Sequence, residues 1–292
     1  MNVILYCLKS IFFALIVAYI SLIGTLIGQS VALFMGLGRS NQTTFIESIS
    51  GVIPFFMVTS FIAIVIGEMF KKLEQSSLER FVCIFFYHYF FFYGLKMLDK
   101  IFSGNDFSLA YELISQIVPA LIFAFLVTIL WKPEKIGEPF IYQLKNYLVN
   151  CKFKRWWLRF IIGSVIFVVI FYFTNWLIAP FLQQYNTTLT HHAPNGVLIK
   201  LFAGVLYALT ILPIFIRWKE TKTSILYWIG FPIFLQIAVY PAVVEFWLPM
   251  GLRFPYLIQY TVISFLLAIF YVGLFYVPKE SEVIDDQFKW MY

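Results

Sequence analysis

Charged side chains are rare in the long apolar stretches of this 292-residue sequence, so those that occur there are its first candidates for chemistry. An ionisable group in a hydrocarbon layer is costly, and its presence is by default a hypothesis for a functional site. Asp99 and Glu245 stand at corresponding places in two halves of the sequence, 146 positions apart. Lys96 and Arg253 are near them in the sequence and could neutralise the two acids. This pattern indicates a polar site between the two halves.

Further polar residues extend this candidate site. Thr25 and Asn175 occupy matching places in two apolar stretches, and Glu112 and Gln116 enter a third. His88 lies within Phe-Tyr-His-Tyr-Phe-Phe-Phe, where a neutral imidazole bonded to a neighbouring helix is a commoner arrangement than a ligand-binding group or a proton carrier. The predicted binding residues are Asp99, Glu245, Glu112, Gln116, Arg253, Asn175, Thr25 and His88. An alternative is that the charged residues lie at the membrane interface and extend their side chains into water.

The elements that hold these residues are predicted from composition and apolar run length. Hydrophobic residues make up 61% of the chain and charged residues only 12%, about half the charged fraction of a soluble domain. Runs of roughly 20 apolar residues match the length of a membrane-spanning helix, and backbone groups in lipid must bond within the segment. We therefore predict an all-α integral membrane protein with about eight spans, at 10–34, 50–70, 81–101, 108–131, 157–182, 196–217, 224–247 and 255–277.

The distribution of basic residues predicts the orientation. If the N-terminus is cytoplasmic, 16 of the 21 Lys and Arg residues lie on the inner side, as the positive-inside rule requires. We therefore expect both termini in the cytoplasm and a multi-pass protein of the bacterial cytoplasmic (inner) membrane. The net charge of +6 is then a sign of topology rather than of nucleic-acid binding. The three cysteines form no CxxC or Cys/His spacing, so neither a disulfide framework nor a metal site is indicated.

Short motifs that recur at the ends of the spans in both halves predict an internal duplication. Gly51-Val52 opens one span as Gly196-Val197 opens another, and each half has four spans. Two copies with an even number of spans lie the same way up, with a pseudo-twofold axis along the membrane normal. A short amphipathic helix, with basic residues near anionic headgroups, is expected between them. The predicted parts are 1–135 as the first repeat, 136–156 as the linker, 157–280 as the second repeat and 281–292 as a cytoplasmic tail.

These features leave three classes of function open. A transporter-like or small-molecule- or lipid-binding protein would have its site between the repeats, on the outer side. A membrane-embedded enzyme acting on a lipid or lipid-linked substrate would use Glu112, His88 or Glu245 as acid or base, but no HExxH, GxSG or Walker motif is present. A non-catalytic subunit, assembly factor or immunity protein would explain the scarcity of buried charge. Membrane lipids, a small ligand and a protein partner or second copy are the expected partners, with no nucleic acid and no cofactor.

Overall fold

The computed structural model describes residues 3–37, 49–95, 97, 109–150, 156–183, 196–244 and 250–277. These residues are almost entirely helical and include no strand. Seven helical segments among them are long and apolar enough to cross a membrane: Val3–Phe34, Gly51–Lys71, Ala110–Leu130, Trp156–Phe181, Gly196–Arg217, Lys222–Val244 and Met250–Phe275. The protein is therefore an all-α, multi-pass integral membrane protein, as predicted.

The spanning helices match the predicted spans closely. They are α1 (Val3–Phe34), α2 (Ile49–Lys71), α5 (Leu109–Leu130), α7 (Trp156–Gln183), α8 (Gly196–Arg217), α9 (Lys222–Phe234) continued by η4 (Leu235–Val239) and α10 (Tyr240–Val244), and α11 (Met250–Phe275). The remaining predicted span, 81–101, corresponds to α3 (Ser77–Tyr89) and η2 (Phe90–Gly94). Its outer end lies mostly outside the described residues, so the count of eight stays a prediction.

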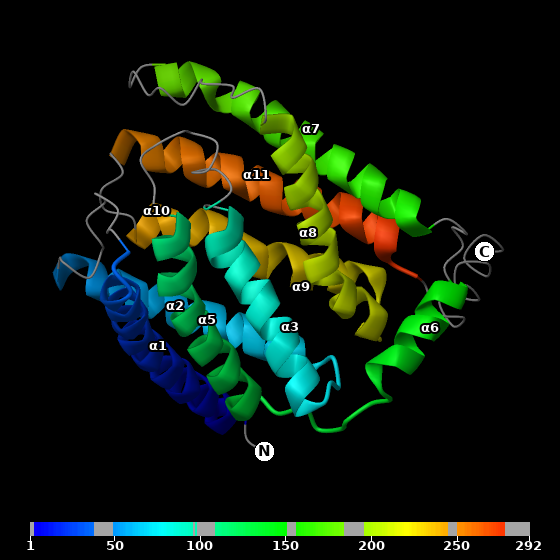
Figure 1. The fold of residues 1–292 in the computed structure, drawn as a ribbon. Helices are drawn as coiled ribbons and strands as arrows, with labels where there is room; N and C mark the ends of the chain where they lie inside the picture. Colours follow the sequence, from blue (N-terminus) through cyan, green and yellow to red (C-terminus); the bar gives the residue numbers. More distant parts are fainter. Residues whose placement is uncertain are drawn as a thin grey trace.

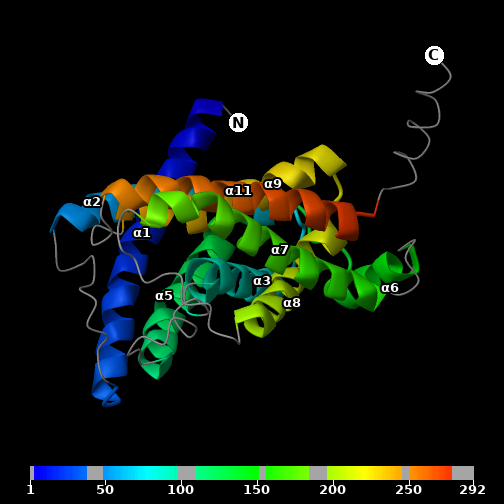
Figure 2. The same ribbon diagram turned by 90° about the horizontal axis from the view of Figure 1, so that it is seen from above.

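One end of the helix bundle carries a group of ion pairs, namely Lys72–Glu220, Arg217–Glu79 and Lys219–Glu74. We call it the inner end, after the orientation that the sequence predicts, and the opposite end the outer end. The inner end comprises residues 71–80, 131–150 and 217–224. The short helix α6 (Phe140–Asn150) lies outside the bundle at this end, as Figures 1 and 2 both show. The hydroxyl of Tyr147 in α6 donates to the carbonyl of Phe275 at 2.5 Å. This bond ties the linker helix to the last turn of α11.

The helices pack in the same way before and after α6. In the first part α1 packs against α2 and α5, and α3 packs against α5. In the second part α7 packs against α8, which crosses it in Figure 1, and against α11, which runs beside it there; α9 packs against α11. The contact between the two parts is made by α2, α3 and η2 on one side and by α8, α9, η4 and α10 on the other.

Two glycines allow the closest of these helix approaches. A Cβ atom on Gly28 of α1 would stand 2.2 Å from the carbonyl oxygen of Ser115 in α5. A Cβ atom on Gly204 of α8 would stand 2.6 Å from the Cα atom of Ser164 in α7. Small residues at membrane helix contacts allow the backbones to come together in this way.

Two π-helical turns interrupt the spanning helices at corresponding places. Ser76 caps α3 by accepting from the N–H of Glu79 at 3.4 Å, and Thr221 caps α9 by accepting from the N–H of Ser224 at 3.3 Å. Each helix then runs for 13 residues before its π-helix, η2 or η4, begins. Pro232 in α9 lacks an N–H and so removes one helical hydrogen bond shortly before η4. Turns of this type occur frequently at functional sites.

Candidate functional site

A buried hydrogen bond joins the two interrupted helices. Nδ1 of His88, in the last turn of α3, lies 3.0 Å from Oε1 of Gln236 in η4. His88 is 3% exposed and Gln236 is fully buried. The bond crosses from one part of the protein to the other, next to the place where η2 contacts η4.

The bonding of Gln236 determines which ring nitrogen of His88 carries the proton. Nε2 of Gln236 donates to the carbonyl of Pro232 at 3.3 Å, which places its amide oxygen toward the imidazole. An amide oxygen can only accept, so Nδ1 of the neutral ring must donate. The lone pair of the neutral ring is then on Nε2 of His88, which makes this nitrogen the acceptor of the ring.

Aromatic rings surround the imidazole. The ring of His88 stacks on Phe123 of α5, with centroids 3.8 Å apart and planes 15° apart. It also lies 4.8 Å from the ring of Phe92 in η2, which in turn lies 4.2 Å from Tyr240 in α10. The surroundings are apolar and the pair is uncharged, so the site suits a polar but neutral group of a ligand better than a carboxylate.

The structure separates the other described site residues into two groups. Thr25 on α1 donates to the carbonyl of Ser21 in its own helix at 3.0 Å. Glu112 and Gln116 lie half-buried on the outer part of α5. All three belong to helices of the first part, and α1 and α5 pack together.

The second group lies on α7 and α11. The side-chain oxygen of Asn175 accepts a hydrogen bond from Nε2 of Gln259, which links these two helices. Arg253 is half-buried near the outer start of α11. His88, by contrast, bonds across the contact between the two parts. Asp99 and Glu245 lie outside the described residues, although each follows an interrupted helix in the sequence.

A second polar cluster, at the inner end, joins the same two parts. Lys72 pairs with Glu220 at 2.6 Å, and Lys219 pairs with Glu74. Arg217 donates through Nε and Nη2 to the two carboxylate oxygens of Glu79, at 2.9 and 2.5 Å. Each ion pair joins the turn between α2 and α3, or the start of α3, to the end of α8 or the turn that follows it. We call these residues the inner charge clamp: Lys72, Glu74, Glu79, Arg217, Lys219 and Glu220.

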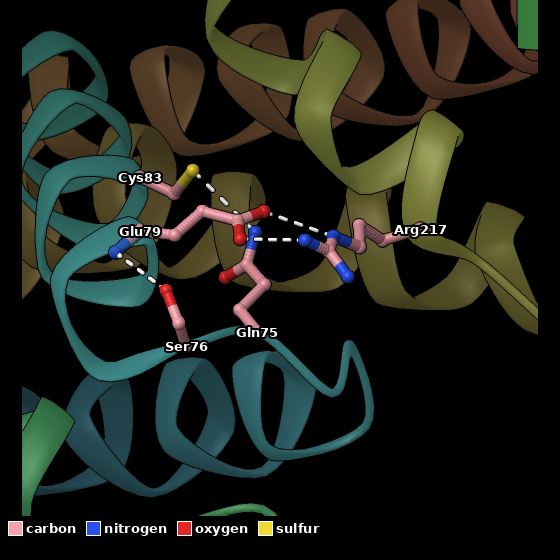
Figure 3. A network of polar contacts seen from close by, with 5 residues as sticks. All are labelled: Gln75, Ser76, Glu79, Cys83 and Arg217. Atoms are coloured by element: carbon pink, nitrogen blue, oxygen red, sulfur yellow. Dashed lines mark hydrogen bonds and ion pairs between the residues drawn. The ribbon is translucent and has the colours of Figure 1, made fainter. Parts of the chain in front are cut away.

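The pair of Arg217 and Glu79 is the buried part of the clamp. Figure 3 shows the guanidinium and the carboxylate pointing toward each other, with Gln75 and Cys83 beside them. Arg217 is 2% exposed, and the amide nitrogen of Gln75 donates to Sγ of Cys83 at 3.4 Å. The bidentate geometry is the strong form of an arginine–carboxylate contact.

The segment that follows α5 closes over the clamp. The N–H of Gly137 donates to the carbonyl of Glu74 at 2.8 Å. A Cβ atom on Gly137 would lie 3.3 Å from Nη1 of Arg217, so the segment lies directly against the guanidinium. Glu74 has a φ of 51°, in the left-handed region that side chains other than glycine rarely adopt. The clamp therefore holds a strained residue in place.

Sequence reasoning did not find the partner of His88 or the clamp. Gln236 lies in an apolar run and was not singled out, because nothing local marks it as the partner of a residue 148 positions away. For the clamp a signal did exist. Positions 74 and 219 correspond at the offset of the two halves, and they carry opposite charges. No group of three or more His, Cys, Asp and Glu residues that could hold a metal ion occurs among the described residues.

Taken together, the fold and its polar contacts define a multi-pass helical membrane protein with a buried polar bridge at its centre and an ion-pair cluster at one end. No family model matches the sequence, and the comparisons with curated proteins and with solved structures give no match either.

Proposed function

We propose that this protein is a transporter-like membrane protein that binds a small molecule between two parallel four-helix halves. The observation that supports the proposal most strongly is the buried hydrogen bond between His88 and Gln236. It lies where two interrupted helices of different halves meet. Substrate sites of many transporters lie near the membrane midplane, between structural repeats, and are formed by discontinuous helices.

The duplication is part of the proposal, with 1–135 and 157–280 as the two halves and 136–156 as the linker. Three features recur at a spacing of 145 residues: the capping residues Ser76 and Thr221, the π-helices η2 and η4, and the charged positions 74 and 219. In the last two cases the corresponding features contact each other. Features that pair with their own counterparts must lie on the axis that relates the halves. Since one is at the inner end and one is deep in the bundle, this axis would run along the membrane normal.

The proposed path to the site opens on the outer side. Asp99 follows η2 and Glu245 follows α10 in the sequence, so both acids would flank the entrance from the outer side. Asn175, Arg253, Thr25, Glu112 and Gln116 would add polar groups in the outer parts of the surrounding helices. With the basic inner end in the cytoplasm, the termini would be cytoplasmic and the membrane would be the bacterial cytoplasmic membrane.

We do not extend the proposal to an enzyme. The hydrogen bonds of His88 and Gln236 lead to an amide and a backbone carbonyl, and not to a carboxylate or a nucleophile, within the described residues. A nucleophile that is activated by a general base normally lies within hydrogen-bond reach of it.

Ligand-dependent thermal stability tests the proposal. The unfolding temperature of the purified protein would be measured in the presence of each of a panel of amino acids, sugars, nucleosides, organic acids and lysolipids. A ligand at 100 times its Kd stabilises the folded state by about 2.7 kcal/mol. We expect the shift to disappear in His88→Ala and in Gln236→Leu. It should persist in Ser264→Ala, whose buried hydroxyl donates to the carbonyl of Tyr260 in its own helix at 2.6 Å.

The outer acids and the transport step need their own measurements. Asp99→Asn combined with Glu245→Gln should abolish the same shift, and uptake of the stabilising compound into proteoliposomes would separate a transporter from a binding protein. A ligand whose shift survives the loss of His88, Gln236 and both acids would refute the proposed site.

A further inference from the structure

We propose that the inner charge clamp is the gate that closes the inner side of the path to His88 and Gln236. The inference rests on the proposed function and concerns how access to that site is controlled. In the described conformation the clamp is closed. Opening would separate the two halves at the inner end and expose the site to the cytoplasm.

The connectivity of the clamp supports a gate. All three ion pairs cross between the halves: Lys72 with Glu220, Lys219 with Glu74, and Arg217 with Glu79. Two of them join the turns that precede α3 and α9, the two helices that lead to η2 and η4, and the third joins the end of α8 to the first turn of α3. A relative movement of the halves at the inner end must therefore break every pair. The same movement would act directly on the helices that hold the His88–Gln236 bond.

Two of the three ion pairs are partly exposed and the third is buried. The side chains of Lys72 and Glu220 are 36% and 43% exposed, and those of Lys219 and Glu74 are 48% and 30% exposed. The side chain of Arg217 is only 1% exposed. Exposed pairs are weak because water competes for them. A buried pair separates at low cost only when water can reach both ions. Opening should therefore be cooperative, because the buried pair is released only after the exposed pairs separate.

Stability alone explains the clamp poorly. Exposed ion pairs contribute little to folding, and a buried pair is often no better than well-packed apolar residues. This cluster nevertheless places six charges on one contact between the halves. Glu74 in addition keeps a left-handed backbone, at φ 51°, while Lys219 and the N–H of Gly137 hold it. Strain that is held by breakable contacts is typical of switch regions.

Cys83 offers a natural reporter of the gate. Its Sγ atom accepts from Gln75, and its surroundings include the buried Arg217–Glu79 pair. The closed clamp should shield this thiol from reagents on the inner side. The parent for the experiment is the full chain with Cys7→Ser and Cys151→Ser, so that Cys83 is the single cysteine left. The measurement is the rate at which a membrane-impermeant maleimide labels it in inside-out vesicles.

The variants test charge pairing rather than charge itself. Loss of one exposed pair in Glu74→Ala or Lys219→Ala should raise the labelling rate roughly two- to fivefold, the range expected for such pairs. The swap of Glu74→Lys with Lys219→Glu should restore the parent rate. Glu138→Ala and Lys135→Ala are the matched controls, since both remove exposed charges at the same end and outside the clamp. The controls should leave the rate unchanged.

Two outcomes would overturn the gate: single clamp variants that label at the parent rate, or a charge swap that labels no slower than the single variants. A misfolded variant is recognised by the swap, because restored pairing should restore the parent rate only in a folded protein. The labelling needs no ligand. A positive result without any stabilising ligand would therefore count against the proposed function alone, and a ligand at His88 with unchanged labelling would count against the gate alone.

Discussion

Replacing Arg217 with leucine should destabilise the protein strongly. The guanidinium makes two hydrogen bonds to Glu79, at 2.9 and 2.5 Å, and the residue is 2% exposed. Removing one partner of a buried pair typically costs 3–5 kcal/mol, because the other charge stays buried without compensation. The side chain of Glu79 keeps 16% exposure, which lets water solvate part of the carboxylate. We therefore expect a loss of about 2–4 kcal/mol.

The paired replacement sharpens this prediction. Arg217→Leu combined with Glu79→Leu removes both charges. The free energy of unfolding of this double variant should lie within about 1 kcal/mol of the wild-type value. Reversible unfolding in mixed micelles with increasing SDS, followed by tryptophan fluorescence, measures both values. A single variant that loses less than about 1 kcal/mol, or a double variant that is less stable than the single one, would show that Arg217 is not held by this pair.

Further expectations concern helix packing and the linker, and the same unfolding assay measures them. Gly28→Ala should cost about 1–3 kcal/mol or more, because the new Cβ would meet the carbonyl of Ser115. Gly273→Ala is its matched control: nothing lies within 4 Å of its Cβ position, so the variant should be neutral or up to about 1 kcal/mol more stable. Equal losses in the two variants would contradict the close packing. Tyr147→Phe should lose about 0.5–1.5 kcal/mol with its hydrogen bond to Phe275, and an unchanged stability would mean that this bond does not hold α6.

The spanning helices were predictable because membrane insertion depends on local composition. The predicted span 196–217 coincides with α8, and 157–182 differs from α7 by one residue at each end. The first helix begins at Val3 and not at residue 10, since Lys9 does not interrupt it. The ammonium group of Lys9 instead lies 5.3 Å from the ring centroid of Phe13, one turn further along the same helix. A charge near a helix end is therefore a weak boundary marker.

The candidate site was less predictable because its contacts are distant in the sequence. His88 was singled out as an intramembrane imidazole, and its expected bond to a neighbouring helix is confirmed by Gln236. The identity of that neighbour depends on how the two halves pack against each other, and hydropathy does not predict that packing. The π-helices were also not predicted, since apolar runs read the same in α- and π-helical geometry. The roles of Asp99 and Glu245 and the internal duplication stay predictions.

The π-helices change the direction in which the side chains beyond them face. A π-turn holds one residue more than the α-helix that continues on both sides of it. Each residue of an α-helix turns by about 100°, so residues beyond η2 and η4 face about 100° away from where an unbroken helix would put them. Hydropathy does not change, and the helix still spans the membrane. Removing one residue from η4 would thus rotate Tyr240 and everything after it in α10 relative to the His88–Gln236 bond, while leaving the membrane topology as it is.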